Sequence, residues 1–191
     1  MKIGVLALQG AFREHRLMIE QCGVTAVEIR KKSELDDIAG LILPGGESTT
    51  IGKLMVDWGL MEKIQERTRQ GMAIYGTCAG MILLAKNIID SDQPRLGLMD
   101  ITVRRNAFGR QTESFEADLN VVELGSEPLK AVFIRAPIIE EVGLNVKVLA
   151  KVNDKIVIAR QDKLLVTAFH PELTGDDRIH RKFIAMAQEK S

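Results

Sequence analysis

An α/β fold with a mostly parallel central sheet is the architecture that this sequence predicts. In the first half of the chain, short apolar runs alternate with stretches of helical periodicity, as in strand–helix–strand crossover units. The opening run, Ile3 to Leu8, is apolar almost throughout, as expected of a parallel strand covered on both faces. After about Gln93, short turns join the apolar runs, which favours antiparallel pairing in the C-terminal half.

The first half is predicted to contain four strands and the helices that connect them. A turn at Gln9-Gly10 starts the first helix, Ser33 begins a capped short helix, and Gly45-Gly46 ends the third strand. We expect strands at 3–8, 24–29, 40–44 and 72–75, and helices at 11–21, 33–37, 49–57, 60–70 and 81–86.

The second half is predicted to be rich in strands. Asn153-Asp154 and Gln161-Asp162 are hairpin turn signals between apolar runs. We expect strands at 101–103, 120–122, 131–134, 146–152, 155–159 and 164–169, and a final amphipathic helix at 176–188. These strands either extend the sheet or form a small antiparallel layer beside it.

The composition is that of an ordinary globular protein. Hydrophobic residues make up 46% and charged residues 27% of the 191 residues, and the formal net charge is zero. No global field would therefore attract nucleic acid or an anionic membrane. Two cysteines fit a reducing compartment, and no apolar run approaches the roughly 20 residues that cross a bilayer. We expect a cytoplasmic protein with a single domain over residues 1–191.

The most informative segment is Gly76-Thr77-Cys78-Ala79-Gly80, which lies between a predicted strand and a predicted helix. A nucleophile flanked by glycines at such a junction is typical of a nucleophile elbow, where larger side chains at the glycine positions would collide with neighbouring backbone. The helix N-terminus favours a thiolate. Cys78 is therefore a candidate nucleophile for acyl transfer, whereas Cys22 is interpreted as a small apolar residue.

A candidate base follows the last predicted strand. His170 comes directly after an apolar run, at the sheet edge where open α/β folds place their active sites, and Pro171 fixes the backbone there. Glu172 is near enough to orient the imidazole, as a nucleophile–base–acid triad requires. His15 and His180 lie among charged neighbours in helical segments, and we interpret both as surface residues.

A glycine-rich loop, residues 44–49, follows the third predicted strand. It lacks the lysine and the spacing of a phosphate-binding loop. We interpret it as half of an oxyanion hole, in which the N–H of Gly46 opposes that of Ala79. A plain tight turn is the alternative, and Ser48 and Thr49 are equally suited to cap the next helix.

Together, these segments resemble the class I, or triad, glutamine amidotransferases. The similarity is stronger still to the glutaminase subunits of pyridoxal 5′-phosphate synthase, although these usually carry serine where Ala107 stands. The resemblance rests on residues 4–10, 13–15, 43–50, 105–111, 114–116, 133–137 and 169–174. It implies a three-layer, flavodoxin-like fold with helices on both faces of the sheet.

The resemblance also implies a reaction and its residues. Glutamine is hydrolysed to glutamate and ammonia by Cys78, His170 and Glu172, and the oxyanions are bound by Gly46 and Ala79. The glutamine contacts of the family correspond to Gly46, Glu47, Ser48, Arg105, Ile134 and Arg135. In physical terms, an arginine suits the substrate α-carboxylate and Glu47 suits its α-ammonium group.

A partner is implied as well. Relatives dock on a synthase subunit, a (β/α)₈ barrel that consumes the ammonia, so no cofactor is expected on this chain. No metal is expected either, because the cysteines and histidines lack ligand spacing. Three alternatives stay open: a glutaminase that serves another acceptor, a catalytically silent subunit with the same fold, and a cysteine hydrolase or chaperone-like relative.

Overall fold

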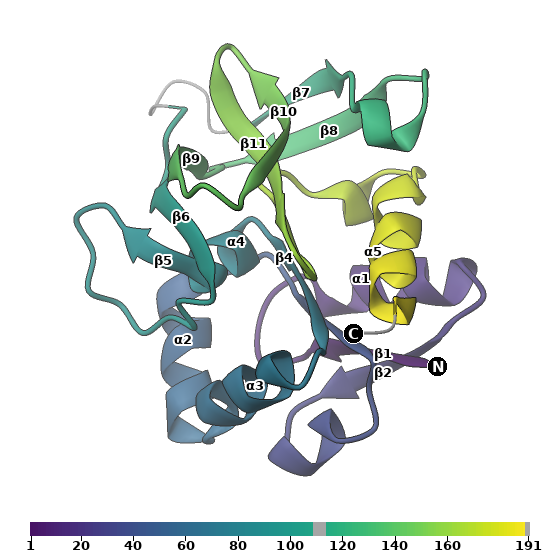
Figure 1. The fold of residues 1–191 in the computed structure, drawn as a ribbon, viewed down its shortest axis with the longest axis vertical. Coiled ribbons are helices and arrows are strands. Elements are labelled where there is room, and N and C mark those ends of the chain that lie inside the picture. The colour runs from purple at the N-terminus through teal and green to yellow at the C-terminus, as the bar shows by residue number, and fades with distance from the viewer. Residues whose placement is uncertain (109–113, 190–191) are drawn as a thin grey trace.

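Strand and helix alternate through the N-terminal half of the computed structural model, which describes residues 1–108 and 114–189 (Figure 1). The elements are β1 (Lys2–Leu6), α1 (Phe12–Gln21), β2 (Thr25–Ile29), the 3-10 helix η1 (Lys32–Leu35), β3 (Gly40–Leu43), α2 (Ser48–Asp57), α3 (Leu60–Arg69), β4 (Ala73–Thr77) and α4 (Ala79–Leu84). Each strand and helix predicted for this half is present, and the ends differ by one or two residues.

The C-terminal half is built mainly of strands. They are β5 (Ala85–Ile88), β6 (Met99–Arg104), β7 (Ser114–Leu119), β8 (Leu129–Ile134), β9 (Ile138–Val142), β10 (Lys147–Val152), β11 (Lys155–Gln161) and β12 (Leu164–Thr167). The helical elements are η2 (Val122–Leu124), η3 (Pro171–Leu173) and α5 (Arg178–Gln188).

The strand predicted at 120–122 is wrong. The chain leaves β7 at Leu119, and Val122 begins η2, so local β propensity was overridden by tertiary context. Strands β5, β7 and β9 were not predicted. Each places polar residues in the middle or at the end of a short run, such as Lys86 and Asn87 in β5, and this conceals the apolar pattern.

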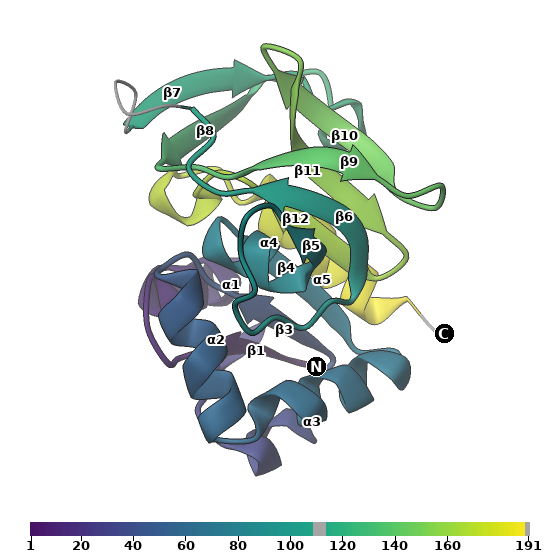
Figure 2. The same ribbon diagram turned by 90° about the vertical axis from the view of Figure 1, so that its left-hand side faces the viewer.

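The parallel part of the sheet has the order β2-β1-β3-β4-β12. Beyond β12 the sheet continues through β11, β9 and β6 with antiparallel pairing, and β5 then pairs parallel to β6. Strand β10 pairs with β11, while β7 and β8 form a separate antiparallel sheet. Figure 2 shows these antiparallel strands gathered at the end of the molecule away from α3. The predicted fold class is confirmed, and the strands both extend the sheet and form a layer beside it.

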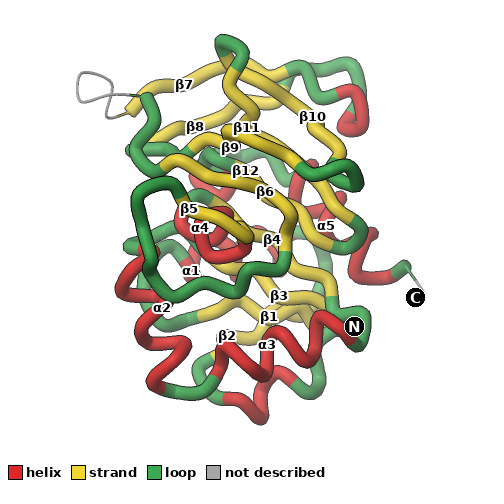
Figure 3. The backbone as a smooth tube through the Cα atoms, turned by 60° about the vertical axis from the view of Figure 1, so that its left-hand side comes forward, coloured by secondary structure: helices red, strands yellow, loops and turns green. Residues whose placement is uncertain are grey.

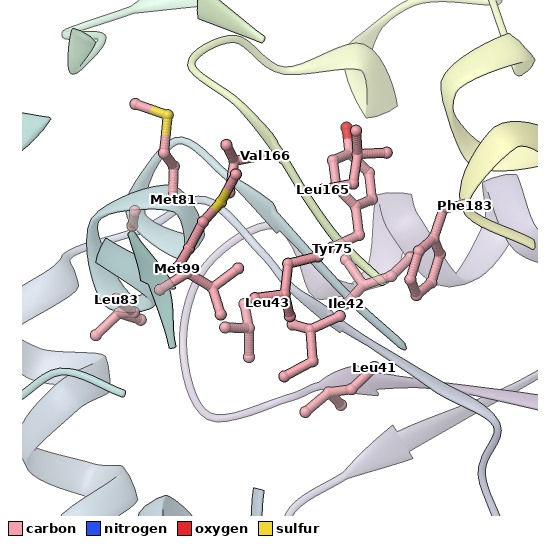
Figure 4. Packing of buried hydrophobic residues seen from close by; sticks show 14 of the residues in the cluster. Leu41, Ile42, Leu43, Tyr75, Met81, Leu83, Met99, Leu165, Val166 and Phe183 are labelled. Atoms are coloured by element: carbon pink, nitrogen blue, oxygen red, sulfur yellow. The ribbon is translucent and has the colours of Figure 1, made fainter. Parts of the chain in front are cut away.

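Helices cover both faces of the parallel strands. Helix α1 packs on β1 and β2 and α5 packs on β4, whereas α4 packs against β3, β4 and β12 on the other face, in contact with α2. All residues of β3, β4 and β12 are buried, because both of their faces are covered. Figure 4 shows this packing: Leu43 and Tyr75 from the sheet lie between Met81 of α4 and Phe183 of α5. Burying each such side chain stabilises the fold by about 1.5–3 kcal/mol.

No helix in the described ranges is both long and apolar enough to span a membrane.

An ion-pair cluster connects η2, β10 and α5, and it makes the stability of the fold depend on pH. Glu123 of η2 pairs with Lys147 of β10 at 2.5 Å and with Lys182 of α5. Hydrogen bonds from these two lysines lower the pKa of Glu123 to about 2. A carboxyl with a depressed native pKa stabilises the fold above its unfolded pKa, and that stabilisation is lost as the pH falls toward 2.

We therefore expect Glu123→Gln to lower the free energy of unfolding by roughly 1 kcal/mol at pH 7 and by much less near pH 2. Urea unfolding at several pH values would measure this. Glu116→Gln is the matched control, because Glu116 pairs with Lys130 and both side chains of this pair are more than half exposed. If the difference in unfolding free energy between Glu123→Gln and the wild type stayed constant from pH 7 down to pH 2, the prediction would be contradicted.

Candidate active site

Cys78 forms the whole connection between β4 and α4. Its backbone has φ 49° and ψ −102°, a strained conformation for a residue with a side chain. A Cβ atom at Gly76 would lie 2.6 Å from the backbone of Gly80, and one at Gly80 would lie 2.1 Å from the carbonyl oxygen of Leu43. The prediction that only glycine fits two residues to either side is therefore confirmed.

His170 and Glu172 lie where the chain leaves β12 and enters η3. The backbone N–H of His170 donates to the carbonyl of Val132 at 2.8 Å, which fixes the position of the histidine beside β8. Its Nδ1 atom lies 2.7 Å from Oε1 of Glu172, and both side chains are buried. The structure therefore brings the two residues into the contact that the sequence predicted.

The electrostatics of this pair favour a charged imidazole. Burial opposes charge on His170, but hydrogen bonds to Cys78 and Glu172 outweigh it and raise the pKa of His170 to about 10. Burial also opposes charge on Glu172, yet His15 and His170 hold the pKa of this carboxyl below its usual range. These contacts therefore favour the protonated form of His170.

A cavity of about 570 Å³ opens above Cys78. The predicted residues other than Glu172 meet there. The parallel strands β3, β4 and β12 bring the glycine loop, Cys78 and His170 to one edge of the sheet, whereas Arg105 follows β6 and Ile134 ends β8 in the antiparallel part. The lining includes Cys78, Ala79 and His170, the loop residues Gly46, Glu47 and Ser48, and Arg105, Ile134 and Arg135. Glu172 lies behind His170 and does not line the cavity.

The glycine loop approaches the cysteine and the histidine closely. A Cβ atom on Gly45 would lie 2.4 Å from Cε1 of His170, so only glycine fits beside the imidazole. The carbonyl of Gly45 accepts from the N–H of Ala11 at 3.0 Å, and the N–H of Glu47 donates to Oε1 of Gln9 at 2.8 Å. These bonds anchor the loop to the turn after β1.

The alternative role of Ser48 and Thr49 as helix caps is wrong. Helix α2 begins at Ser48, its N-cap residue is Glu47, and no side chain caps it. The hydroxyl of Ser48 donates instead to Oε1 of Gln93 at 3.1 Å, and that of Thr49 donates to Glu47 at 2.5 Å.

Gln93 links two of the predicted substrate contacts. Its Oε1 atom accepts from Nη1 of Arg105 at 3.0 Å as well as from Ser48, and Nη2 of Arg105 lies 3.8 Å from Oε1 of Glu47. Gln93 belongs to the long loop between β5 and β6, which Figure 3 shows in green. Sequence reasoning missed it, because no local pattern marks an amide that acts on side chains so distant in the chain.

Arg135 directly follows the strand β8, which ends at Ile134 as the strand predicted at 131–134 does. Its φ is 45°, in the left-handed region. The carbonyl of Ile134 lies 4.0 Å from Sγ of Cys78. The end of β8 thus contributes backbone as well as side chains to the cavity. Gly109, Arg110 and Gln111 of the motif at 105–111 lie outside the described residues.

The interpretation of His15 and His180 as surface residues is wrong. Both are fully buried, on the faces of α1 and α5 that pack against the sheet. The signal was present in the sequence: His15 precedes Met18 and Ile19 at the i+3 and i+4 spacing of a buried helical face. The charged neighbours lie on the other faces. Within the described ranges, no cluster of His, Cys, Asp and Glu could hold a metal ion.

Comparison with known proteins shows which family the chain matches. The model of the SNO glutamine amidotransferase family matches residues 5–189. A "Pyridoxal 5'-phosphate synthase subunit PdxT" from Desulforamulus reducens is 62% identical over 186 residues, which cover 97% of this chain and 99% of that protein. The protein of the same name from Carboxydothermus hydrogenoformans is 63% identical over 184 residues, 96% of each chain.

Solved structures support the same grouping. A crystal structure described as a glutamine amidotransferase superposes with a TM-score of 0.92 at 51% identity, covering 97% of this chain and 98% of the other. A glutamine amidotransferase from Thermotoga maritima superposes with a TM-score of 0.65 at 12% identity, covering 98% of this chain and 93% of the other. This second likeness concerns the fold alone.

Proposed function

Because the chain belongs to the SNO glutamine amidotransferase family, we propose that it is the glutaminase subunit of a pyridoxal 5′-phosphate synthase. One observation carries the assignment of the site: Cys78 and His170 meet in a single cavity with Arg105 and Glu47, and Glu172 hydrogen-bonds the histidine from behind. The cavity therefore combines an acyl-transfer centre with a charged pair suited to an amino acid.

In the proposed reaction, the thiolate of Cys78 attacks the side-chain amide carbon of glutamine. The imidazolium of His170 donates its proton to the departing nitrogen, and ammonia leaves a thioester behind. Glu172 holds the ring in the required orientation and stabilises its charge. Water, deprotonated by His170, then hydrolyses the thioester to glutamate. The N–H groups of Gly46 and Ala79 are proposed to stabilise both oxyanions, each contributing about 3 kcal/mol.

The charged residues of the cavity suit the head group of glutamine. Arg105 and Glu47 present opposite charges 3.8 Å apart, so an α-carboxylate and an α-ammonium group can each find a partner at neighbouring positions. Gln93 orients the guanidinium of Arg105. We propose that Ser48, Ile134 and Arg135 complete this subsite and hold the amide over Cys78.

The head-group assignment predicts a change in KM. Arg105→Met should raise the KM for glutamine by about 10- to 100-fold, because a charge-assisted pair contributes about 1.5–3 kcal/mol. Steady-state kinetics would measure it. Arg104→Met is the matched control, since the neighbouring Arg104 pairs with Glu140 outside the cavity. Equal effects from both substitutions would contradict the assignment.

A partner that receives the ammonia follows from the same proposal. The cavity opens at the edge of the sheet formed by Gly10, Ala11 and the loop after β3, and Leu173 and Ile134 expose apolar surface beside it. We propose that the synthase subunit docks over this edge. We further propose that residues 1–191 act as a single domain, since the sheet continues through both halves. We also propose that this domain acts in the cytoplasm, because two cysteines fit a reducing compartment.

Glutamate release from glutamine tests the proposal. We expect little release by the purified chain alone and a rise of at least about tenfold when the synthase subunit is added. Activity that this partner leaves unchanged would indicate a glutaminase with another acceptor. No release under any condition would indicate a catalytically silent subunit.

A further inference from the structure

Two fully buried histidines lie behind the proposed active site. Nδ1 of His15 in α1 is 2.9 Å from Nε2 of His180 in α5. The ring of Tyr75 in β4 packs edge-on against both, and Figure 4 shows Tyr75 beside Phe183 on this face of the sheet. Neither histidine lines the cavity, and the proposed mechanism uses neither. Such buried polar side chains are costly unless they are hydrogen-bonded.

His15 also faces the second oxygen of Glu172. The first oxygen, Oε1, is 2.7 Å from His170, while Oε2 lies 3.4 Å from Nε2 of His15. In the described part of the chain, Oε2 has no hydrogen-bond partner. The same Nε2 atom of His15 is 3.1 Å from the hydroxyl of Thr77, next to Cys78. The carboxylate therefore lies between two imidazoles, one at each oxygen.

The proton positions follow from the contacts. One N–H must lie between Nδ1 of His15 and Nε2 of His180. If His15 supplied it, a lone pair on Nε2 of His15 would face the carboxylate of Glu172, which is repulsive. If His180 supplies it, His15 carries its proton on Nε2 and directs it toward Glu172 and Thr77. Nδ1 of His180 is then a lone pair, in agreement with its lack of a partner among the described residues.

We propose that His15 is a positioning residue for the triad: its Nε2–H, oriented by His180, holds the Glu172 carboxylate so that Oε1 faces His170. This inference rests on the proposed function of Cys78, His170 and Glu172. The hydroxyl of Thr77 accepts from the same N–H. Because Thr77 precedes Cys78, this contact also connects His15 to the nucleophile elbow.

The surroundings keep His15 neutral. Burial lowers the pKa of His15, and the charge of Glu172 opposes this without reversing it; His170 and Glu14 have smaller effects. Burial and His15 lower the pKa of His180 to about 3. Tyr75, which packs against both rings, is itself kept neutral because burial raises its pKa. Neither buried histidine therefore takes up the proton that the proposed mechanism needs on His170.

Loss of the His15 N–H should alter the pH dependence of the reaction. Glu172 is shielded from water, so removing a donor raises its pKa and protonates it at a higher pH. A protonated Glu172 orients His170 poorly. The acid limb of kcat/KM for glutamine should therefore move to higher pH.

The test compares His15→Leu with His15→Gln in the complex with the synthase subunit. We expect His15→Leu to lower kcat about 10- to 100-fold, to leave KM unchanged, and to move the acid limb up by about one pH unit. His15→Gln restores an N–H donor near the position of Nε2 and should recover most of both effects. Ile19→Ala, a buried change on the same helix, should lower Tm and leave the limb in place.

A wild-type pH profile in His15→Leu, or an equal shift in Ile19→Ala, would overturn the inference. If His15→Leu does not fold, histidine nitrogen NMR of the wild-type chain decides: we expect His15 neutral and protonated at Nε2, and a proton at Nδ1 would overturn the inference. These outcomes are distinct from failure of the proposed function, in which the wild-type complex itself would release no glutamate.

Discussion

Replacing Cys78 with alanine should reduce glutamate release in the complex by roughly 10⁴- to 10⁶-fold, which is in practice to background. The thiol forms the covalent intermediate in the proposed reaction. Among the described residues that line the cavity, the one other hydroxyl or thiol is that of Ser48, which donates to Gln93. The comparison should be made with the synthase subunit present, where the wild-type rate is highest.

Two controls make this result specific. Cys22→Ala should retain full activity, because Cys22 lies at the C-terminal end of α1 beside Asp177 and does not line the cavity. Glutamine should still bind to Cys78→Ala, since the Arg105–Glu47 pair is intact, and calorimetry would measure this. An electrophilic glutamine analogue should label Cys78 and leave Cys22 free. Residual turnover above about one per cent in Cys78→Ala would exclude the thiol as the nucleophile.

The second large effect is expected at the elbow itself. Gly80→Ala would place a Cβ atom 2.1 Å from the backbone oxygen of Leu43. This clash is with backbone, so no side-chain rotation can relieve it. Either α4 moves away from β3 or the elbow opens, and both displace Cys78. We expect a loss of about 3 kcal/mol or more of stability, which corresponds to a fall in Tm of roughly 6–12 °C for a chain of this size, together with loss of activity.

Gly175→Ala provides the matched control for this change. A Cβ atom added at Gly175 would meet no heavy atom within 4 Å, and the residue has no positive φ. The added methyl group should therefore change stability by less than about 0.5 kcal/mol. Thermal unfolding and glutaminase assays of the two variants would measure the contrast. Similar Tm values for Gly80→Ala and Gly175→Ala would show that the elbow tolerates a side chain and that its glycines have another role.

Much of this site could be predicted from the sequence, because several of its contacts join residues that are close together in the chain. Gly76 and Gly80 and the central Cys78 belong to one turn, so their spacing alone predicts the elbow. The contact between His170 and Glu172 spans two residues across Pro171, so it also follows from the sequence. The order of parallel strands then brings Cys78 and His170 to the same edge, because β4 and β12 are neighbours in the sheet.

Contacts between side chains that are far apart in the chain could not be predicted in this way. Gln93 reaches Ser48 and Arg105 from a loop without regular structure, and no periodic pattern marks it. The strand assigned to residues 120–122 failed for a related reason, since β-branched residues in a short run do not decide between a strand and a turn of 3-10 helix.

The sequence by itself determined the α/β class, the elbow at Cys78 and the His170–Glu172 pair, because periodicity and glycine spacing act over a few residues. Only the tertiary structure decided what surrounds Glu172. His15 and His180 are 165 residues apart, and their charged neighbours suggested an exposed position. They meet because α1, which covers β1 and β2, and α5, which covers β4, lie on the same face of the sheet, and this packing places both imidazoles behind a buried carboxylate.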